Sequence, residues 1–493
     1  MRFLTTFFLV LLNNSLYAQQ FLLTPDLIGA WQEISRLKLG KAEQLLSNER
    51  RIRPENQLTD VFQFQLYFQK ALATGSPEDE QQFQLAKSRL QQQLTGIRTN
   101  DPWQEWALGY SGMTSLMLRM RAGDQWQTAL EMRRTYSRII SAYEKYPGFV
   151  PNMLTYGLVK VALGSVPDQF TWMLRLASLS GDSREGVDML IRVLNLPDNH
   201  PFSFMRSDAA ILLGMATRAM QTDAATKEVV IQRIRTLDES NLMLTYTSAY
   251  LLMRDGKNEE ALKALHSRPE SPDYLKFPMV DYLLAEALFR KGSKLAEQSY
   301  ARFLRQTKGT MYLSDAQRKL GWFALLNGDT AAYLSRMRQC HEAPASGSER
   351  DAEAKREASS TQIPHPALIL ARLRFDGGYF NEANEILEKS AYLFEGKNKA
   401  HYLEYLYRSA RIADGMGQSD KALLLYDKTY HQGLASPEYY AANSALRLGE
   451  LFESKGEKKE AAIWFNRCLN LKPQAYRTSI HAAARAGLRR VAN

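Results

Sequence analysis

Residue types that usually carry catalysis or bind metals are scattered along this sequence. Its seven histidines are too widely spaced for two of them to sit three to five residues apart on one helix: His200, His266, His341, His365, His401, His431 and His481. His341 and Glu342 do not continue into the H-E-x-x-H motif of zinc proteases, and there is no C-x2-C pair. The sequence therefore predicts no metal site.

Patterns for nucleophilic and phosphate chemistry are missing as well. The stretch 109–112 (GYSG) lacks the spacing of a G-x-S-x-G nucleophile elbow, and neither a G-x4-G-K-[ST] loop nor a G-x-G-x2-G loop occurs. Ser35 and Lys38 match S-x-x-K, but neither S-D-N nor K-T-G accompanies them, so a solvated helix face explains both residues better. We predict that the protein is not an enzyme and needs no cofactor.

The best-defined pattern is architectural and lies in residues 445–473. Apolar and small side chains follow helical spacing on two successive faces, which comprise Ala445, Leu448, Gly449 and Phe452, then Ala461, Phe465, Cys468 and Leu469. Gly456 supplies a turn between the faces, and Pro473 cannot continue the second helix. Small residues at Gly449 and Ala461 allow two antiparallel helices to approach closely. The segment therefore predicts a helix pair.

The spacing of residues 445–473 resembles the tetratricopeptide repeat, W-x2-L-G-x2-Y followed by A-x3-F and P, with Ala445 replacing the tryptophan and Phe452 the tyrosine. An alanine recurs every 39 residues, each time five residues after a glycine, at Ala383, Ala422 and Ala461. We therefore predict an all-α fold, a right-handed α-solenoid of antiparallel helix pairs similar to tetratricopeptide arrays, with one disordered insertion.

Residues 147–194 have a character of their own. They combine a helix entered through a proline, a Val-Pro-Asp break at 166–168 and a Ser-Gly-Asp turn at 180–182. This stretch is similar to the corresponding part of the tetratricopeptide-39 and inclusion-body-clearance group of helical repeat proteins, and the resemblance implies a shared scaffold. An ordinary degenerate repeat, in which Gly186 takes the place of Ala461, accounts for the same residues.

Residues 1–18 have the character of a secretory signal peptide. They carry one charge, at Arg2, followed by the apolar run 7–12 and the small residue Ala18. A first buried helix is the alternative interpretation. No cysteine follows the apolar run, so a lipid anchor is not expected, and no later stretch has the roughly 18 apolar residues that a membrane span needs. We predict a soluble protein exported to the periplasm.

Composition divides the rest of the chain. Residues 342–362 contain no aromatic residue and no Val, Ile, Leu or Met, so we expect a disordered linker or loop at 342–364. It would separate an N-terminal array of degenerate repeats (19–341) from C-terminal repeats (365–473), which end in a capping helix (474–493). A basic membrane-surface helix is the alternative for the last segment. The sequence leaves open whether the array is continuous or split into two stacks.

Charge and cysteine content restrict the function only weakly. The formal net charge of +10 is modest for 493 residues and spread along the chain, which permits an acidic partner without demanding one. Export would allow Cys340 and Cys468 to form a disulfide. Because Cys468 falls on a core-facing position, we expect a buried free thiol there instead.

The candidate site is the concave face of the C-terminal repeats. The tetratricopeptide resemblance implies that the first helix of each pair lines this face, which places six residues there: Arg372, Tyr407, Arg408, Arg411, Asn443 and Arg447. The arginines could pair with carboxylates of a bound peptide. Alternatively, they pair within the chain with Glu404, Asp414 and Glu450. Some tetratricopeptide proteins clamp a terminal carboxylate, but here only Asn443 and Arg447 approach that pattern.

These observations favour a non-catalytic, exported scaffold of the tetratricopeptide type that binds a protein or peptide partner, plausibly an acidic one, through its concave face. We expect no nucleic-acid partner and no transmembrane segment. The alternative is a glycan-binding component of an outer-membrane uptake complex, in which tryptophans stack on sugar rings. The candidates for stacking are Trp103, Trp106, Trp126 and Trp172.

Overall fold

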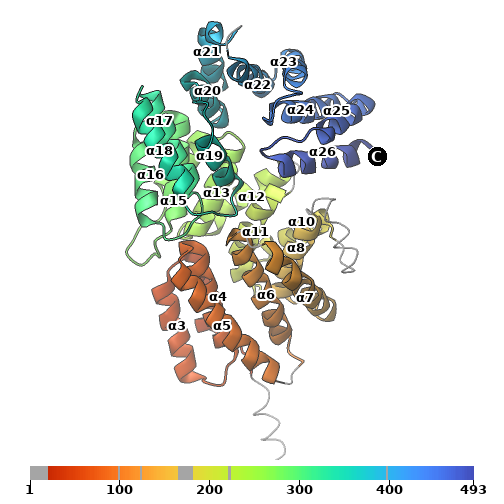
Figure 1. Cartoon of the computed structure of the whole chain (residues 1–493). Helices are drawn as coiled ribbons and strands as arrows, with labels where there is room; N and C mark the ends of the chain where they lie inside the picture. The colour runs from red at the N-terminus through yellow and green to blue at the C-terminus, as the bar shows by residue number, and fades with distance from the viewer. Residues whose placement is uncertain are drawn as a thin grey trace, which may run out of the picture.

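The computed structural model describes residues 20–97, 100–122, 125–164, 181–219, 224–395 and 398–492. Throughout these ranges the regular elements are helices, without a β-strand, and successive helices pack as neighbouring pairs (Figure 1). The predicted all-α solenoid of helix pairs is therefore confirmed. The signal peptide expected at 1–18 and the break expected at 166–168 lie outside the described residues.

Two groups of helices build the molecule, and we call them the N-terminal stack and the C-terminal stack. The N-terminal stack contains α2 (Pro25–Arg36), α3 (Leu39–Ile52), α4 (Leu58–Thr74), α5 (Pro77–Gly96), α6 (Pro102–Ala122), α7 (Gln125–Lys145), α8 (Val150–Gly164), α10 (Ser183–Leu194), the short η2 (Ser203–Met205), α11 (Arg206–Ala219), α12 (Ala224–Leu237), α13 (Leu242–Arg254), α14 (Asn258–His266), α15 (Pro278–Lys291), α16 (Leu295–Gln306), α17 (Leu313–Leu326), α18 (Thr330–Glu342) and α19 (Glu349–Ala358). The C-terminal stack contains α20 (Pro366–Asp376), α21 (Phe380–Ser390), η3 (Ala391–Leu393), α22 (Lys399–Gly415), α23 (Ser419–Gln432), α24 (Tyr440–Ser454), α25 (Lys458–Asn470) and α26 (Arg477–Ala492).

Close helix packing in the C-terminal stack depends on glycines around one phenylalanine. A Cβ atom on Gly449 of α24 would lie 2.5 Å from Cδ1 of Phe465, which is fully buried in α25. Gly487 of α26 approaches the same ring, and its Cβ would lie 2.3 Å from Phe465 Cζ. Gly456 has a φ of 80°, as the turn between α24 and α25 requires. The predicted helix pair is thus present, and a third helix closes over it.

The N-terminal stack closes on itself. The indole Nε1 of Trp31 in α2 donates to Asp208 Oδ2 of α11 at 2.8 Å, and Arg36 Nε donates to Asp238 Oδ2 at 2.7 Å. Helix α2 also contacts α13, and α4 contacts α15 (Figure 1). One continuous apolar core consequently runs from Leu27 to the start of the C-terminal stack.

Helix α19 occupies the segment for which the sequence predicts a disordered linker. It packs against α17 and α18 and buries Asp351 and Ala354. The Asp351 carboxylate accepts the backbone N–H of Tyr312 at 2.7 Å and that of Asp315 at 3.0 Å. The prediction of disorder is wrong for this helix. It considered only apolar side chains, whereas polar contacts anchor α19.

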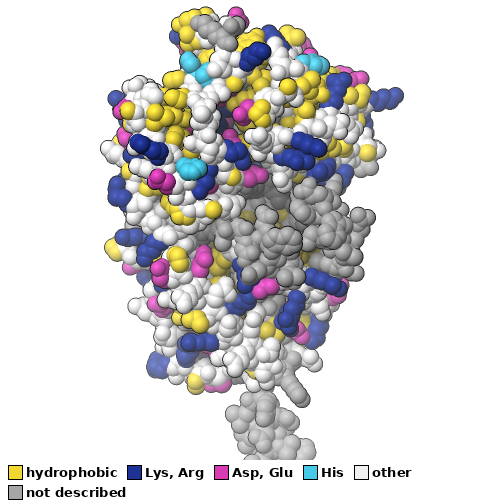
Figure 2. Space-filling view, viewed as in Figure 1, with side chains coloured by type: hydrophobic (Ala, Val, Ile, Leu, Met, Phe, Trp, Pro, Cys, Tyr) yellow, Lys and Arg dark blue, Asp and Glu magenta, His cyan; other side chains and the backbone are white. Residues whose placement is uncertain are grey.

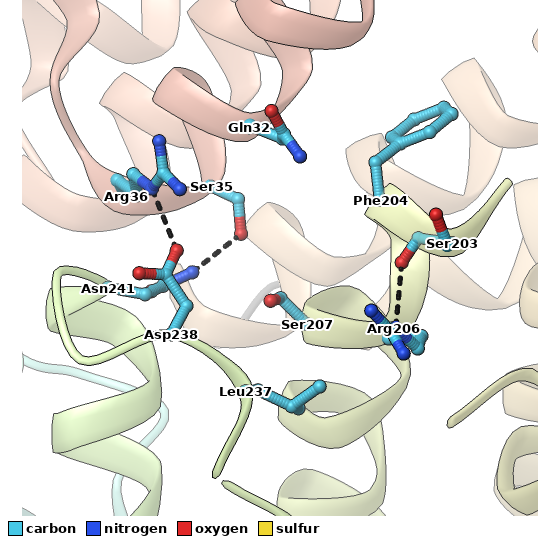
Figure 3. A pocket seen from close by; sticks show the side chains of 10 residues that line it. All are labelled: Gln32, Ser35, Arg36, Ser203, Phe204, Arg206, Ser207, Leu237, Asp238 and Asn241. Carbon is cyan, nitrogen blue, oxygen red and sulfur yellow. Dashed lines mark hydrogen bonds and ion pairs between the residues drawn. The ribbon is translucent and has the colours of Figure 1, made fainter. Parts of the chain in front are cut away.

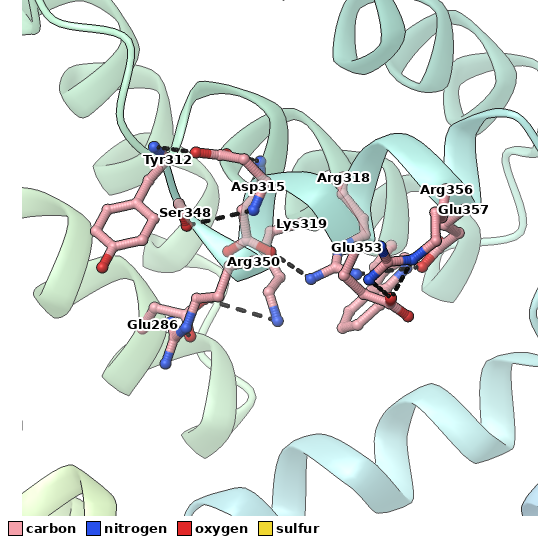
Figure 4. A network of polar contacts seen from close by, with 12 residues as sticks. Glu286, Tyr312, Asp315, Arg318, Lys319, Ser348, Arg350, Glu353, Arg356 and Glu357 are labelled. Carbon is pink, nitrogen blue, oxygen red and sulfur yellow. Dashed lines mark hydrogen bonds and ion pairs between the residues drawn. The ribbon is translucent and has the colours of Figure 1, made fainter. Parts of the chain in front are cut away.

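A network of charged side chains joins α19 to the rest of the N-terminal stack (Figure 4). Arg350 Nη1 donates to Glu286 Oε2 at 3.2 Å and to the Tyr282 hydroxyl at 3.1 Å. Glu357 accepts from Trp322 Nε1 at 2.6 Å. These partners belong to α15 and α17, so α19 links two successive repeats and forms the end of the N-terminal stack.

Helix α20 joins the two stacks. Ile369 and Leu373 enter the large N-terminal core, whereas Leu368 and Ala371 face a separate cluster of the C-terminal stack. The helix packs against α15 and α17, and Arg290 Nη1 of α15 donates to the carbonyl of its last residue, Asp376, at 2.9 Å. The C-terminal stack therefore begins on α15 and α17 of the N-terminal stack. The sequence left open whether the array is continuous or split, and the structure shows two stacks that are joined through α20.

Both cysteines are free and buried, which confirms the expectation for Cys468. Burial raises the pKa of each thiol to about 12, so neither is a reactive thiolate at neutral pH.

Candidate functional site

The structure brings the six predicted site residues together on the first helices of the three C-terminal pairs. Arg372 projects from α20, Tyr407, Arg408 and Arg411 project from α22, and Asn443 and Arg447 project from α24. We call these six residues the arginine strip. Because α20, α22 and α24 contact one another in order, the strip crosses three repeats on one side of the stack.

Tyr407 is the buried centre of the strip. Its hydroxyl oxygen accepts from Arg411 Nη1 at 3.1 Å and from Asn443 Nδ2 at 2.5 Å, which links α22 to α24. Burial alone would raise the pKa of the Tyr407 hydroxyl, but Arg411 and Arg408 together outweigh burial and lower it. The guanidinium of Arg411 also lies 4.7 Å from the centre of the Phe375 ring on α20.

The four arginines of the strip differ in how they are paired. Arg408 Nη2 lies 2.9 Å from Glu404, and Arg447 Nη1 lies 2.8 Å from Glu450, so the alternative of pairing within the chain is correct for these two. Arg372 Nε is 3.9 Å from its nearest carboxylate, which is too long for a hydrogen bond.

Arg411 is the arginine of the strip without a carboxylate partner. No Asp or Glu oxygen of the described residues lies within 4.0 Å of its guanidinium, whose hydrogen bond goes to the Tyr407 hydroxyl. Asp414, which the sequence offered as a partner for an arginine, instead accepts from the Tyr426 hydroxyl at 3.0 Å. Arg411 and Arg372 consequently have donors available for an external acceptor.

Cations continue beyond the strip onto the N-terminal stack, and the sequence analysis missed them. The Trp322 ring of α17 has Lys319 Nζ 4.2 Å from its centre and Arg318 Cζ at 5.0 Å, while Arg372 Cζ of α20 lies at 5.1 Å. The spacing of Arg318 and Lys319, four and three residues before Trp322, is a signal for one shared helix face. Nothing in the sequence connects that face to Arg372.

A polar crevice of about 150 Å³ lies far along the chain from the strip, where α2 meets η2 and α11 (Figure 3). Asn241 Nδ2 donates to Ser35 Oγ at 3.0 Å, and Arg36 pairs with Asp238. Arg206 Nε donates to the Ser203 carbonyl at 3.1 Å. The first two contacts join α2 to the segment before α13. The crevice therefore lies where the first and later helices of the N-terminal stack meet.

Sugar stacking is not supported by the tryptophans that the structure describes. Trp103 and Trp106 are 6% and 3% exposed and pack among Trp31 and Phe62 in the core. The side chain of Trp126 and the whole of Trp172 lie outside the described residues. The glycan alternative therefore loses two of its four ring candidates, because a large aromatic at helical spacing is more often part of the core than of a binding surface.

Two further kinds of functional feature are absent from the described residues. No group of three or more His, Cys, Asp or Glu side chains there could hold a metal ion, and no helix there is long and apolar enough to cross a bilayer. Figure 2 shows their Lys and Arg side chains dispersed among acidic ones, with hydrophobic side chains gathered over the C-terminal stack. The arginine strip with its extension to Trp322 is therefore the candidate site.

Comparison with known proteins identifies no family. No protein-family model matches the sequence, and no curated protein matches it. Among solved structures, the human IFIT1 dimer with m7Gppp-AAAA aligns with 93% of this chain and 99% of its own at 12% identity and a TM-score of 0.30. The human IFIT1 dimer with PPP-AAAA aligns with 93% and 98% at 13% identity and a TM-score of 0.29. These values are too low to assign a ligand or a family to this chain.

Proposed function

We propose that the protein is a non-catalytic interaction scaffold that binds an extended, acidic peptide segment of a partner protein along the arginine strip. The observation that carries this proposal is the spacing of Arg372 and Arg411 on successive first helices, each with donors not satisfied by a carboxylate at hydrogen-bond distance. Arginine forks are suited to carboxylates, and an extended peptide presents carboxylates along the direction in which the helices succeed one another.

The remaining members of the strip support this reading by holding its shape. Tyr407 and Asn443 fix Arg411 through the shared hydroxyl, and Glu404 and Glu450 hold Arg408 and Arg447. Because these side chains are ordered before binding, less conformational entropy is lost when a partner binds. Only the two arginines with spare donors need to gain new acceptors.

Peptide binding to the purified chain tests the proposal. A labelled twelve-residue peptide of alternating Glu and Gly should bind, and a Gln-Gly peptide of the same length should bind at least tenfold more weakly. The double variant Arg372→Gln with Arg411→Gln should lose about tenfold or more in affinity for the acidic peptide. The matched control is Arg467→Gln, which removes an exposed arginine from the second helix of the last pair.

Two results would contradict peptide binding at the strip. Equal affinity for the acidic and the Gln-Gly peptide would remove the role of carboxylates. Preferential binding of an RNA oligonucleotide over the acidic peptide would replace the protein partner with a nucleic acid.

Export to the periplasm belongs to the same proposal and is supported by Arg2, the apolar run 7–12 and Ala18. Mass measurement of the native protein should show a chain that begins at or near Gln19. A native chain that retains Met1 would contradict export.

A further inference from the structure

Three cations gather around Trp322 where the two stacks meet. Lys319 and Arg318 come from α17, and Arg372 comes from α20, yet all three lie within about 5 Å of the centre of the same ring. Like charges repel at this range, so the arrangement needs compensation by negative groups.

Several donors of these cations lack an acceptor in the chain, although Arg318 Nη2 donates to Asp315 Oδ1 and forms a buried ion pair with it. The Arg318 side chain is 2% exposed, and its Nε and Nη1 have no hydrogen-bond partner within the described ranges. The Lys319 side chain is 8% exposed, and the nearest carboxylate oxygen, on Glu286, is 3.8 Å from Nζ. Arg372 stands 3.9 Å from Asp376. Each of these last two distances exceeds that of a hydrogen bond.

The neighbouring carboxylates already accept hydrogen bonds. Asp315 accepts from Arg318 Nη2 and from the Tyr282 hydroxyl. Glu286 accepts from the Tyr300 hydroxyl and from Arg350 of α19. Glu357 accepts from Trp322 Nε1 and from the Tyr333 hydroxyl. A rotation of either carboxylate toward Lys319 or Arg318 would break hydrogen bonds that hold α19 in place. The described residues therefore offer no carboxylate at hydrogen-bond distance to Lys319 Nζ, to Arg372 Nε or to Nη1 of Arg318.

Buried charged donors without acceptors are costly, and such groups in native proteins usually bind an ion or a water molecule. Guanidinium and ammonium groups form their strongest hydrogen bonds with negatively charged oxygens. On the side of α20 the cluster borders solvent, since the side chains of Arg372 and Asp376 are 21% and 40% exposed.

We propose that Lys319, Arg318 and Arg372 bind an oxyanion, a phosphate or carboxylate group, at the junction of the two stacks. The site shares Arg372 with the arginine strip, whereas Lys319 and Arg318 lie outside the strip and belong to this site alone. Burial lowers the pKa of Lys319 to about 8; the charges of Glu286 and Asp315 oppose this, and those of Arg318 and Arg372 add to it. An oxyanion with two or more oxygens can accept from all three side chains, and it would hold α17 and α20 together.

Isothermal titration of the full-length chain with inorganic phosphate, and separately with succinate, tests the site at constant ionic strength in sodium chloride. At least one probe should bind saturably, and the tighter of the two identifies the group as phosphate or carboxylate. Lys319→Met and Arg372→Gln should each weaken that binding at least tenfold. Arg302→Gln is the matched control, because Arg302 is a cation of the same stack that faces Asp281 at 3.4 Å.

The variants also separate this site from peptide binding. Arg411→Gln should leave the affinity for the oxyanion unchanged. The same variant should weaken peptide binding, because Arg411 belongs to the arginine strip. If Lys319→Met does not fold by circular dichroism, the partly exposed Arg372→Gln carries the test. The inference is overturned if neither probe binds saturably, or if the folded variants bind the probe as tightly as the unchanged chain.

Discussion

The two stacks use the same helix pair in different ways. In the N-terminal stack, α2 and α4 return to contact α13 and α15, so the inner side of the array is filled by other helices. In the C-terminal stack, the helices after α20 pack mainly against near neighbours along the chain, and the first helices carry polar side chains such as Tyr407 and Arg411. In the N-terminal stack, closure thus buries the inner face of the array in the core. In the open C-terminal stack, the corresponding face stays available for a partner.

Removal of the closing contact should have the largest effect. Trp31→Ala removes a ring that is 3% exposed and hydrogen-bonded to Asp208, and truncation of a buried aromatic typically costs about 3–5 kcal/mol. We expect the N-terminal stack to lose stability while the C-terminal stack keeps its own transition. Thermal unfolding followed by circular dichroism, with proteolysis to identify the surviving fragment, measures this. Loss of the C-terminal stack in the same step would mean that the stacks are not separate units.

Release of α19 should have the next largest effect. Asp351→Ala removes the acceptor for two backbone N–H groups, at a cost of about 1.5–3 kcal/mol for hydrogen bonds to a charged group. Limited digestion should then cut within 342–364 much faster than in the unchanged chain. Glu349→Ala, at an exposed position in the first turn of the same helix, is the control and should not accelerate cleavage.

Overpacking of the C-terminal stack should destabilise that stack by as much as, or less than, Asp351→Ala destabilises α19. Gly449→Leu would push the side chain into Phe465, and overpacking typically costs about 1–3 kcal/mol. We expect α24 to α26 to melt earlier and the N-terminal stack to stay intact. Gly456→Ala should cost only about 1 kcal/mol, from the positive φ. If Gly449→Leu has no effect on the first transition, the packing of α24 on α25 differs from that described.

A titration at the closure gives an effect that appears only when the pH is changed. Burial raises the pKa of Asp208 to about 7, although the hydrogen bond from Trp31 opposes this. A carboxyl group whose pKa is raised in the folded state contributes stability at low pH and loses it as the pH rises from about 4 to 7. The melting temperature of the unchanged chain should therefore fall relative to that of Asp208→Asn between pH 4 and pH 7. Parallel curves for the two proteins would contradict the raised pKa.

Local features could be predicted from the sequence, and distant ones could not. Gly456 and the face that contains Gly449 were predictable because the residues that explain them lie within one helix pair. The contact of Trp31 with Asp208 joins positions 177 residues apart, and no pattern in either segment indicates it. Helix α19 was missed because its order depends on backbone donors of another helix, which composition does not reveal.

The candidate site was predictable in part for the same reason. Tetratricopeptide spacing placed the six residues of the strip on first helices, but it could not say which arginines find a carboxylate in the chain. Glu404 and Glu450 lie one turn from their arginines, whereas Arg411 interacts beyond its own helix with the Phe375 ring of α20. Lys319 and Arg318 were missed because only the joining of the stacks brings them to Arg372.

The closure of α2 onto α11 also imposes an order of events during synthesis. Asp208 is made 177 residues after Trp31, and at about 5–20 residues per second the first helix pair therefore waits about 9–35 s for its partner. The part of its apolar face that α11 and α13 cover stays exposed during that time, although α4 and α6 cover the rest earlier. The pairs of the C-terminal stack, whose contacts lie within neighbouring repeats, can assemble as soon as each second helix has been made.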